Sequence, residues 1–181
     1  AQAAVLAASN LAASLNAGAK AVSDVRTQAD KSIGQAVDQV NSLLTQFQSV
    51  NNSIVMGLSS NANVSSLQDK RDSIVSQIAQ QIGVSTSVDG NGSMSIYTDT
   101  GLMLYQNTPA TLTFSPSGQL GPTNTGAQVY INGAPLTGAG SNATTQSGAI
   151  AGLTQLRDTI APQYQAQLDQ LAGNLITAFQ E

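Results

Sequence analysis

Apolar residues recur at helical spacing through the first third of the chain. Their steps alternate between four and three residues in the second half of this stretch, which is the spacing of a heptad seam. The residues on this seam are Ile33, Val37, Val40, Leu44, Phe47, Asn51, Ile54 and Leu58. Since no proline interrupts the pattern, it predicts one continuous helix from Ala3 to about Gly57. Such a helix is roughly 80 Å long, too long for a compact domain of this size.

Two features of this helix bear on its partners. Upstream of the seam the stripe continues through many alanines, whose small side chains let a partner helix approach closely. Asn51 is the polar member of the seam, and two interpretations are open. It is either a buried residue that fixes the register of packing or a residue that faces outward where the stripe drifts.

A second helix follows a polar turn at residues 58–64. Ser65 and Gln68 match a capping box at its start, and Asn63 is an alternative cap. Its apolar stripe runs through residues 67, 74, 78 and 82, and Gly83 is placed to end it as a C-terminal cap.

The last helix is expected from about Ala149 to Phe179, where apolar residues again recur at helical spacing. Pro162 lies inside this pattern. Because proline lacks an N–H and clashes with the carbonyl four residues back, a kink is predicted there.

Between residues 84 and 147 the period changes to two. Residues 84–88 and 94–98 alternate on either side of the turn sequence Asp-Gly-Asn-Gly, which predicts a hairpin. Further short strands are expected at residues 102–105, 111–114 and 129–131, with Asn132-Gly133 as another turn. Residues 137–148 are rich in Gly, Ser, Thr, Asn and Ala and are expected to form a flexible return loop.

These elements predict a mainly α protein with a β insert, an α+β class. Residues 1–83 and 148–181 are expected to form a discontinuous helical rod, a long antiparallel bundle or coiled coil. Residues 84–147 are expected to form a small β-rich domain of hairpins. The stripe of the first helix is longer than the helices available to cover it, so part of it is expected to lack a partner within the chain.

Composition narrows the function. Hydrophobic residues make up 41% of the chain, enough to bury a core, whereas charged residues make up only 9%, well below the usual quarter. Ala, Ser, Thr, Asn and Gln take the place of the missing charged residues. The surface they form is polar and nearly uncharged, which suits packing against other copies or other subunits. The net charge of −4 and the scattered basic residues exclude a basic stripe for nucleic acid, and an anionic membrane surface with it.

The chain contains no Cys and no His. This removes thiol nucleophiles, Ser-His-Asp triads and nearly all zinc sites, and no cofactor is expected. Residues 89–93 resemble the start of a calcium loop but lack the later ligands, so they are interpreted as a turn. Asp69, Asp72 and Asp158 could form a carboxylate pair for glycoside hydrolysis, but two of them directly follow an arginine. Ion pairing or helix-end electrostatics explains them more simply, and an enzyme is not expected.

The aromatic residues are few. Phe47, Tyr164 and Phe179 lie on helical stripes and are expected in the core. Tyr97, Tyr105 and Tyr130 fall on predicted strands, where one or two are expected as surface contacts.

One internal similarity links the second and last helices. Each contains Leu, three residues, Arg-Asp, Ser or Thr, and Ile, so that Leu and Ile lie seven apart on one helix face. We interpret this as two helix starts that dock in a similar way, each with an arginine that can bind a neighbouring carbonyl or carboxylate. The structural motif residues are Leu67, Arg71 and Asp72 in the first copy and Gly152, Leu153, Arg157 and Asp158 in the second.

The segment Leu67-Gln68-Asp69-Lys70-Arg71-Asp72, followed by a short helix to Gly83-Val84, resembles the flagellar hook-associated protein 1 family. So do Ser95-Ile96-Tyr97-Thr98 before Gly101, and Gly148-Ala149-Ile150-Ala151-Gly152-Leu153 continuing to Arg157-Asp158 and Pro162. Leu171-Ala172 and Ala178-Phe179 close the last helix in the same way. The resemblance extends from about Ala3 to Phe179.

This resemblance implies a structural subunit at the junction between the hook and the filament of the bacterial flagellum. The implied partners are other copies in a ring, the hook protein and the next hook-associated protein, with no nucleic acid and no membrane. It further implies an extracellular location, export without a cleaved signal peptide, and a chaperone bound through terminal regions absent from this central fragment. The alternative from another class is an adhesin-like module that binds through its β insert. Exposed aromatic residues gathered on one face of the insert would favour it.

Overall fold

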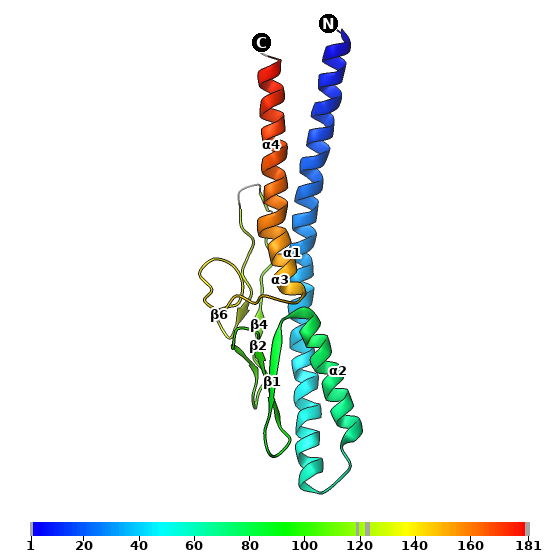
Figure 1. Cartoon of the computed structure of the whole chain (residues 1–181), viewed down its shortest axis with the longest axis vertical. Coiled ribbons are helices and arrows are strands. Elements are labelled where there is room, and N and C mark those ends of the chain that lie inside the picture. Colours follow the sequence, from blue (N-terminus) through cyan, green and yellow to red (C-terminus); the bar gives the residue numbers. More distant parts are fainter. Residues whose placement is uncertain (1, 119, 122–123, 180–181) are drawn as a thin grey trace.

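The structure, a computed structural model, describes residues 2–118, 120–121 and 124–179. One helix, α1 (Gln2–Ser59), runs from one end of the molecule to the other (Figure 1). α2 (Ser65–Gln81) turns back along its C-terminal part. The chain returns through α3 (Ala149–Gln155), a π-helical turn η1 (Leu156–Ile160) and α4 (Ala161–Ala178), which lies beside the N-terminal half of α1. The predicted fold class, long antiparallel helices with a small β-rich part, is confirmed.

The ends of α2 differ from the capping prediction. Ser65 is the first helical residue, and its N–H and hydroxyl both donate to Oδ1 of Asn63, at 3.0 and 2.7 Å. Asn63 therefore provides the polar contact at the helix start, and the capping box is wrong. At the other end Ile82 is already extended, with φ −147°. Gly83 is needed for close approach instead, because a Cβ there would collide with the side chains of Ser147 and Asp99.

The insert forms two antiparallel three-stranded sheets, with orders β1-β2-β3 and β4-β5-β6. The first contains β1 (Val84–Val88), β2 (Met94–Thr98) and β3 (Met103–Tyr105), and the second contains β4 (Leu112–Thr113), β5 (Tyr130–Ile131) and β6 (Ala134–Pro135). The predicted hairpin turn between β1 and β2 is confirmed, and the N–H of Asp89 donates to the carbonyl of Ser93 across it at 2.8 Å.

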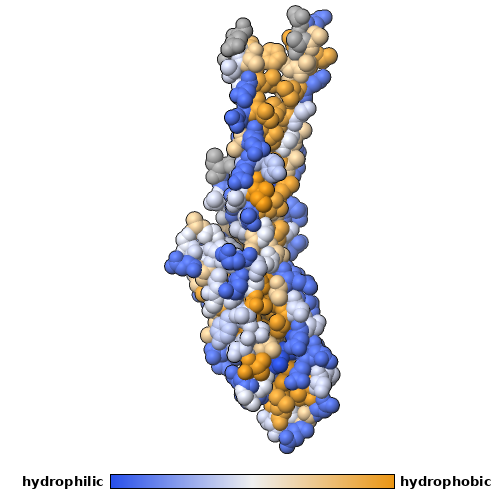
Figure 2. Space-filling model, in the orientation of Figure 1, coloured by the Kyte–Doolittle hydropathy of each residue, from blue (hydrophilic) through white to orange (hydrophobic). Residues whose placement is uncertain are grey.

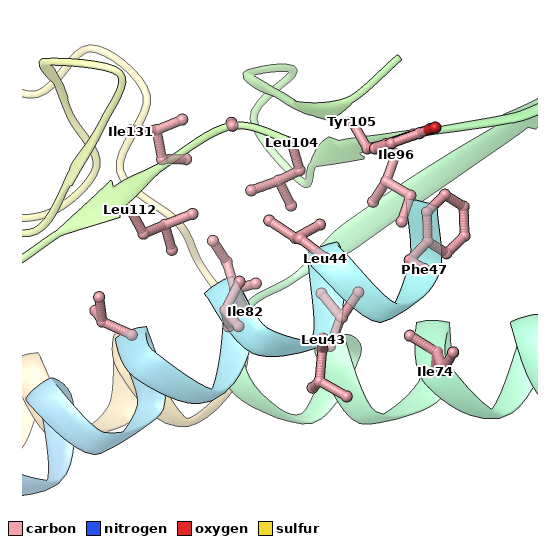
Figure 3. Close-up of a cluster of buried hydrophobic side chains, with 14 of the residues drawn as sticks. Leu43, Leu44, Phe47, Ile74, Ile82, Ile96, Leu104, Tyr105, Leu112 and Ile131 are labelled. Carbon is pink, nitrogen blue, oxygen red and sulfur yellow. The ribbon is translucent and has the colours of Figure 1, made fainter. Parts of the chain in front are cut away.

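One buried core joins the helices to both sheets (Figure 3). Phe47 of α1 and Tyr105 of β3 meet edge to face, with ring centroids 4.9 Å apart and planes at 73°. Ile96, Leu104 and Leu112 of the strands belong to the same cluster as the α1 seam and α2. The insert and the rod thus share side chains across their boundary, and their division at residues 84 and 148 stays a prediction.

Two asparagines of α1 attach the strands to the helix. The amide of Asn41 donates to the carbonyl of Leu112 and accepts from its N–H, both at 2.9 Å. Oδ1 of Asn51 accepts from the N–H of Met94 at 2.9 Å, and Nδ2 donates to Oγ of Ser93 at 3.2 Å. Asn51 is 1% exposed, so the buried interpretation is confirmed. What it positions is the start of β2.

The aromatic predictions hold only in part. Phe47 and Tyr105 are buried, and Tyr130 is 37% exposed. Tyr164 and Phe179 were expected in the core but are 59% and 56% exposed. That expectation is wrong for the described part of the chain, because α1 covers only part of the surface of α4 (Figure 1).

Replacing Asn51 by alanine should lower the free energy of unfolding by about 1–3 kcal/mol, because it leaves the buried N–H of Met94 without an acceptor. The adjacent Asn52 is exposed, so Asn52→Ala is the matched control and should change stability by less than about 0.5 kcal/mol. Urea unfolding followed by circular dichroism measures both. Equal effects of the two substitutions would contradict the assigned role of Asn51.

Candidate assembly interface and the buried arginines beside it

Large apolar side chains remain exposed along the part of the molecule where α1 and α4 lie side by side. Leu171 and Ile176 of α4 are 57% and 60% exposed, and Val5 and Leu6 of α1 are 67% and 65% exposed. Figure 2 shows apolar side chains as a band along this part. We call this set the α1–α4 apolar surface: Val5, Leu6, Leu11, Val25, Ile160, Tyr164, Leu171, Ile176 and Phe179.

A groove of about 260 Å³ lies at the inner end of this surface. It is lined by Ala21, Val22, Val25, Leu156, Ile160, Ala161 and Tyr164. Farther along, α1 and α4 approach closely at Gly18, where a Cβ would lie 3.3 Å from a methyl group of Leu168. Large exposed apolar patches mark sites of protein association, and the band in Figure 2 is a candidate for such a site.

Beside the groove, Arg157 of η1 is buried in a network of charges. Its Nη1 donates to Asp30 of α1, and the two side chains are 1% and 2% exposed. Its Nε and Nη2 donate to the two carboxylate oxygens of Asp158, at 2.9 and 2.7 Å, and Nη2 also reaches the carbonyl of Ala127 at 2.9 Å. The ring of Phe114 lies 5.9 Å from the guanidinium carbon, within range of a cation–π contact.

The π-helical turn explains how Arg26 enters this network. In η1 the N–H of Ala161 donates to the carbonyl of Leu156 instead of that of Arg157, and Pro162 has no N–H to offer. The carbonyl of Arg157 is therefore left without either helical partner. Nε of Arg26 donates to it at 2.8 Å, and the other Arg26 nitrogens donate to the carbonyls of Gly121 and Asn124. The π turn lies just before Pro162, and the kink at this proline stays a prediction.

The pKa values of the two motif arginines shift in opposite directions. Burial acts to lower the pKa of Arg157, but its hydrogen bonds and its attraction to Asp158 and Asp30 together outweigh burial, so the pKa is raised. Burial lowers the pKa of Arg71, which the charge of Asp72 opposes only in part. Both guanidiniums remain charged at neutral pH.

Arg71 is held more weakly than Arg157. It donates to the carbonyl of Gly92 at 2.8 Å and to Oδ1 of Asn51 at 3.3 Å. Its buried Nε has no partner among the described residues. Arg71 therefore connects α2 to the α1 helix and to the β1–β2 turn.

The remaining motif residues do not match between the two copies. Leu67 and Leu153 are both half-buried against the core. Asp72 is exposed, whereas Asp158 binds both Arg157 and the N–H of Gly126. Ile74 is buried and Ile160 is 36% exposed, and Gly152 is exposed. The copies diverge because α2 continues as an α-helix where the second copy enters the π turn.

The sequence pattern does not point to Arg26 or Asp30 as partners of Arg157. The sequence gives only a weak indication of their role: Arg26 and Asp30 are four residues apart, beside the apolar stripe of a helix that has few charges. Asp30 also accepts from the N–H of Ser117 at 2.6 Å. The network therefore joins α1 and η1 to the backbone of residues 117, 121, 124, 126 and 127.

The carboxylates considered for catalysis do not form a site. Asp69 and Asp72 are exposed on α2, and Asp158 is bound by Arg157. A cavity of about 470 Å³ lies between the α3–η1 segment and residues 125–146, lined mainly by Thr, Gln and Gly, with Asp158 at its wall. The described residues contain no cluster of three potential metal ligands. No described helix is long and apolar enough to cross a membrane.

Replacing Arg157 by methionine should lower the free energy of unfolding by about 3–5 kcal/mol, because Asp30 is left buried and uncompensated. Lys20→Met is the matched control, since Lys20 and Asp24 form an exposed pair on α1, and it should change stability little. Pairing Arg157→Met with Asp30→Leu should recover part of the loss. Chemical denaturation measures all of these, and a loss no larger than that of the control would contradict the network.

Comparison with known proteins gives consistent results. A family model described as "Flagellar hook-associated protein FlgK helical domain" matches residues 1–181. Flagellar hook-associated protein 1 of Escherichia coli is 28% identical over 158 residues, covering 86% of this chain and 29% of that protein. The Salmonella typhimurium protein of the same name is 27% identical, with 86% and 28% covered.

A solved structure agrees with the sequence matches. The flagellar hook junction protein FlgK from Burkholderia pseudomallei matches with a TM-score of 0.65 and 27% identity, over 86% of this chain and 28% of that one. This chain thus spans less than a third of the length of these relatives. The predicted resemblance is confirmed, and the chain belongs to the FlgK helical domain family of flagellar hook-associated proteins.

Proposed function

We propose that this chain is the helical packing part of a structural subunit in the ring that joins the flagellar hook to the filament. The observation that carries the proposal is the α1–α4 apolar surface. Its side chains find no cover in the described part of the chain, and copies arranged around a ring would cover them. The relatives' names, hook-associated protein and hook junction protein, agree with this role.

The surface chemistry supports repeated contact between subunits. Charged residues make up only 9% of the chain, so neighbouring copies bring few like charges together. Depletion of charge at the centre of an interface is typical of protein–protein contacts. The few basic residues are scattered and form no basic stripe in the sequence, which argues against nucleic acid as a partner.

The arginine network supports a mechanical role. It attaches η1 to α1 at the point where the two-helix part leaves the body of the molecule. A buried, multiply bonded guanidinium allows few alternative geometries. The α1–α4 apolar surface is thereby held in a fixed orientation to the core, as a subunit of a load-bearing ring requires.

The partners and location follow from this role as part of the proposal. They are other copies of the protein, the hook protein on one side and the next hook-associated protein on the other, in the extracellular part of the flagellum. An export chaperone would bind through regions outside this chain. No catalytic activity is proposed.

The adhesin-like alternative receives less support. Exposed aromatic residues gathered on one face of the insert would favour this alternative. Tyr105 is buried and Tyr97 is half-buried, while Tyr130 is exposed. These residues do not form a binding platform, and the names of the relatives describe flagellar parts.

Leu171→Glu in the whole protein should prevent ring assembly, because it places a charge within the apolar contact. The isolated chain should keep its stability to within about 0.5 kcal/mol, since the side chain is already exposed. Gln170→Glu is the matched control, because it adds the same charge at the neighbouring exposed position. Motility and the presence of filaments are measured in cells that carry only the variant protein. Normal filaments with Leu171→Glu would contradict the proposal.

A further inference from the structure

The sheet edges of the insert are not equally protected. An edge strand presents unpaired N–H and C=O groups that can pair with another chain, so proteins usually cover or interrupt their edges. The edge at β4 is closed by the amide of Asn41, which bonds both backbone groups of Leu112. The edge at β3 is folded over by the following segment, where the N–H of Ala110 donates to the carbonyl of Leu104 and Pro109 bridges to Tyr105.

The edge at β6 is interrupted as well. Pro135 has no N–H, and its carbonyl accepts from Oγ of Ser141 at 2.7 Å. The carbonyl of the next residue, Leu136, accepts from the N–H of Thr145. Three of the four edges in the described insert are therefore covered or broken.

β1 forms the fourth edge, and its pairing with β2 shows which of its groups are free. The N–H of Asp89 donates to Ser93, and the N–H of Asp99 donates to the carbonyl of Gly83, so residues 83 and 89 both bond across the hairpin. Hydrogen-bonded and non-hydrogen-bonded positions alternate in an antiparallel ladder. Residues 85 and 87 therefore bond to β2, while the backbone groups of Val84, Thr86 and Val88 point away from it.

Nothing in the described part of the chain occupies this edge. Among its hydrogen bonds, none from another segment reaches the backbone of Val84, Thr86 or Val88. Residues 85–88 are exposed, and Val88 is 53% exposed. β1 also lacks the usual protection, since it has no charge, no proline and a regular pairing register along its length.

The sequence of β1 is the same read in either direction: Val84-Ser85-Thr86-Ser87-Val88. An antiparallel pair of two such strands, centred on Thr86, places Thr86 opposite Thr86, Ser85 opposite Ser87, and Val84 opposite Val88. Each is a compatible cross-strand pair. One step beyond, Asp89 falls opposite Gly83, so no two carboxylates stand directly opposite each other.

We propose that the free edge of β1 is a docking site for β1 of a second copy of this chain, paired antiparallel about a two-fold axis at Thr86. The outward N–H and C=O groups of Val84, Thr86 and Val88 in each copy then bond to the other copy. The two hairpin sheets become one continuous sheet. This contact is isologous, unlike the head-to-tail contacts that close a larger ring. It is therefore separate from the α1–α4 apolar surface and does not depend on the proposed function.

Hydrogen exchange resolved by residue distinguishes this contact from association through the helices. As the protein concentration rises, the amides of Val84, Thr86 and Val88 should become protected together with the shift to dimer in sedimentation equilibrium. The amides of Ser85 and Ser87 should stay equally protected at all concentrations, because they already bond to β2. A purely monomeric protein at millimolar concentration, or dimers without added protection at these three amides, would overturn the proposal.

Charged variants at the two-fold axis give a second test. Thr86→Glu and Thr86→Lys should each remain monomeric, because like charges meet across the axis. An equimolar mixture of the two should form heterodimers. Ser85→Glu and Ser85→Lys are offset from the axis, so the two copies of position 85 lie diagonally rather than directly opposite, and the dependence on mixing should be weaker. Circular dichroism confirms that each variant is folded. Homodimers of Thr86→Glu as tight as the wild type, or no heterodimer in the mixture, would contradict the proposed register.

Discussion

α1 presents an apolar stripe that no single partner in the described part of the chain is long enough to cover. α2 covers its C-terminal part, the two sheets lie against its middle, and α3, η1 and α4 follow its N-terminal half. A helix of this length draws its stability mainly from such packing. Where the cover is complete, as at Ile33, Leu44 and Phe47, the side chains are fully buried. Where only α4 remains, the cover is partial: Leu15 and Val22 are half-buried, whereas Leu11 and Val25 are 46% and 44% exposed. The molecule is left there with a surface suited to another subunit.

The polar residues on α1 fix the positions along the helix at which these partners pack. Asn51 is hydrogen-bonded to the start of β2, and Asn41 is hydrogen-bonded to β4. Arg26 and Asp30 both bind Arg157 of η1. Buried polar groups are stable only when they are paired. Each of these side chains therefore discriminates against shifted arrangements that an apolar seam alone would tolerate. The π turn contributes to this pairing, because it leaves the carbonyl of Arg157 free to accept a hydrogen bond from Arg26.

The sequence pattern predicts the long helices, the β1–β2 hairpin and the incomplete cover of α1, because each rests on local periodicity or turn chemistry. It also singles out Arg71 and Arg157, through the similarity of their surroundings. It does not supply their partners, because Asp30 and Gly92 are brought close only by the fold. The roles of Asn63 and Gly83, and the exposure of Tyr164 and Phe179, depend on neighbours that periodicity alone does not identify.

The central claim is that the α1–α4 apolar surface is covered by neighbouring subunits in the assembled flagellum. The chain contains no cysteine, so a Leu171→Cys substitution introduces a single thiol into it. The thiol should react rapidly with a maleimide in the free chain, where position 171 is exposed. It should be protected in isolated hook–filament junctions, while Gln106→Cys on the insert reports the accessibility of the protein as a whole. Equal reactivity of Leu171→Cys in the free chain and in assembled junctions would contradict the account.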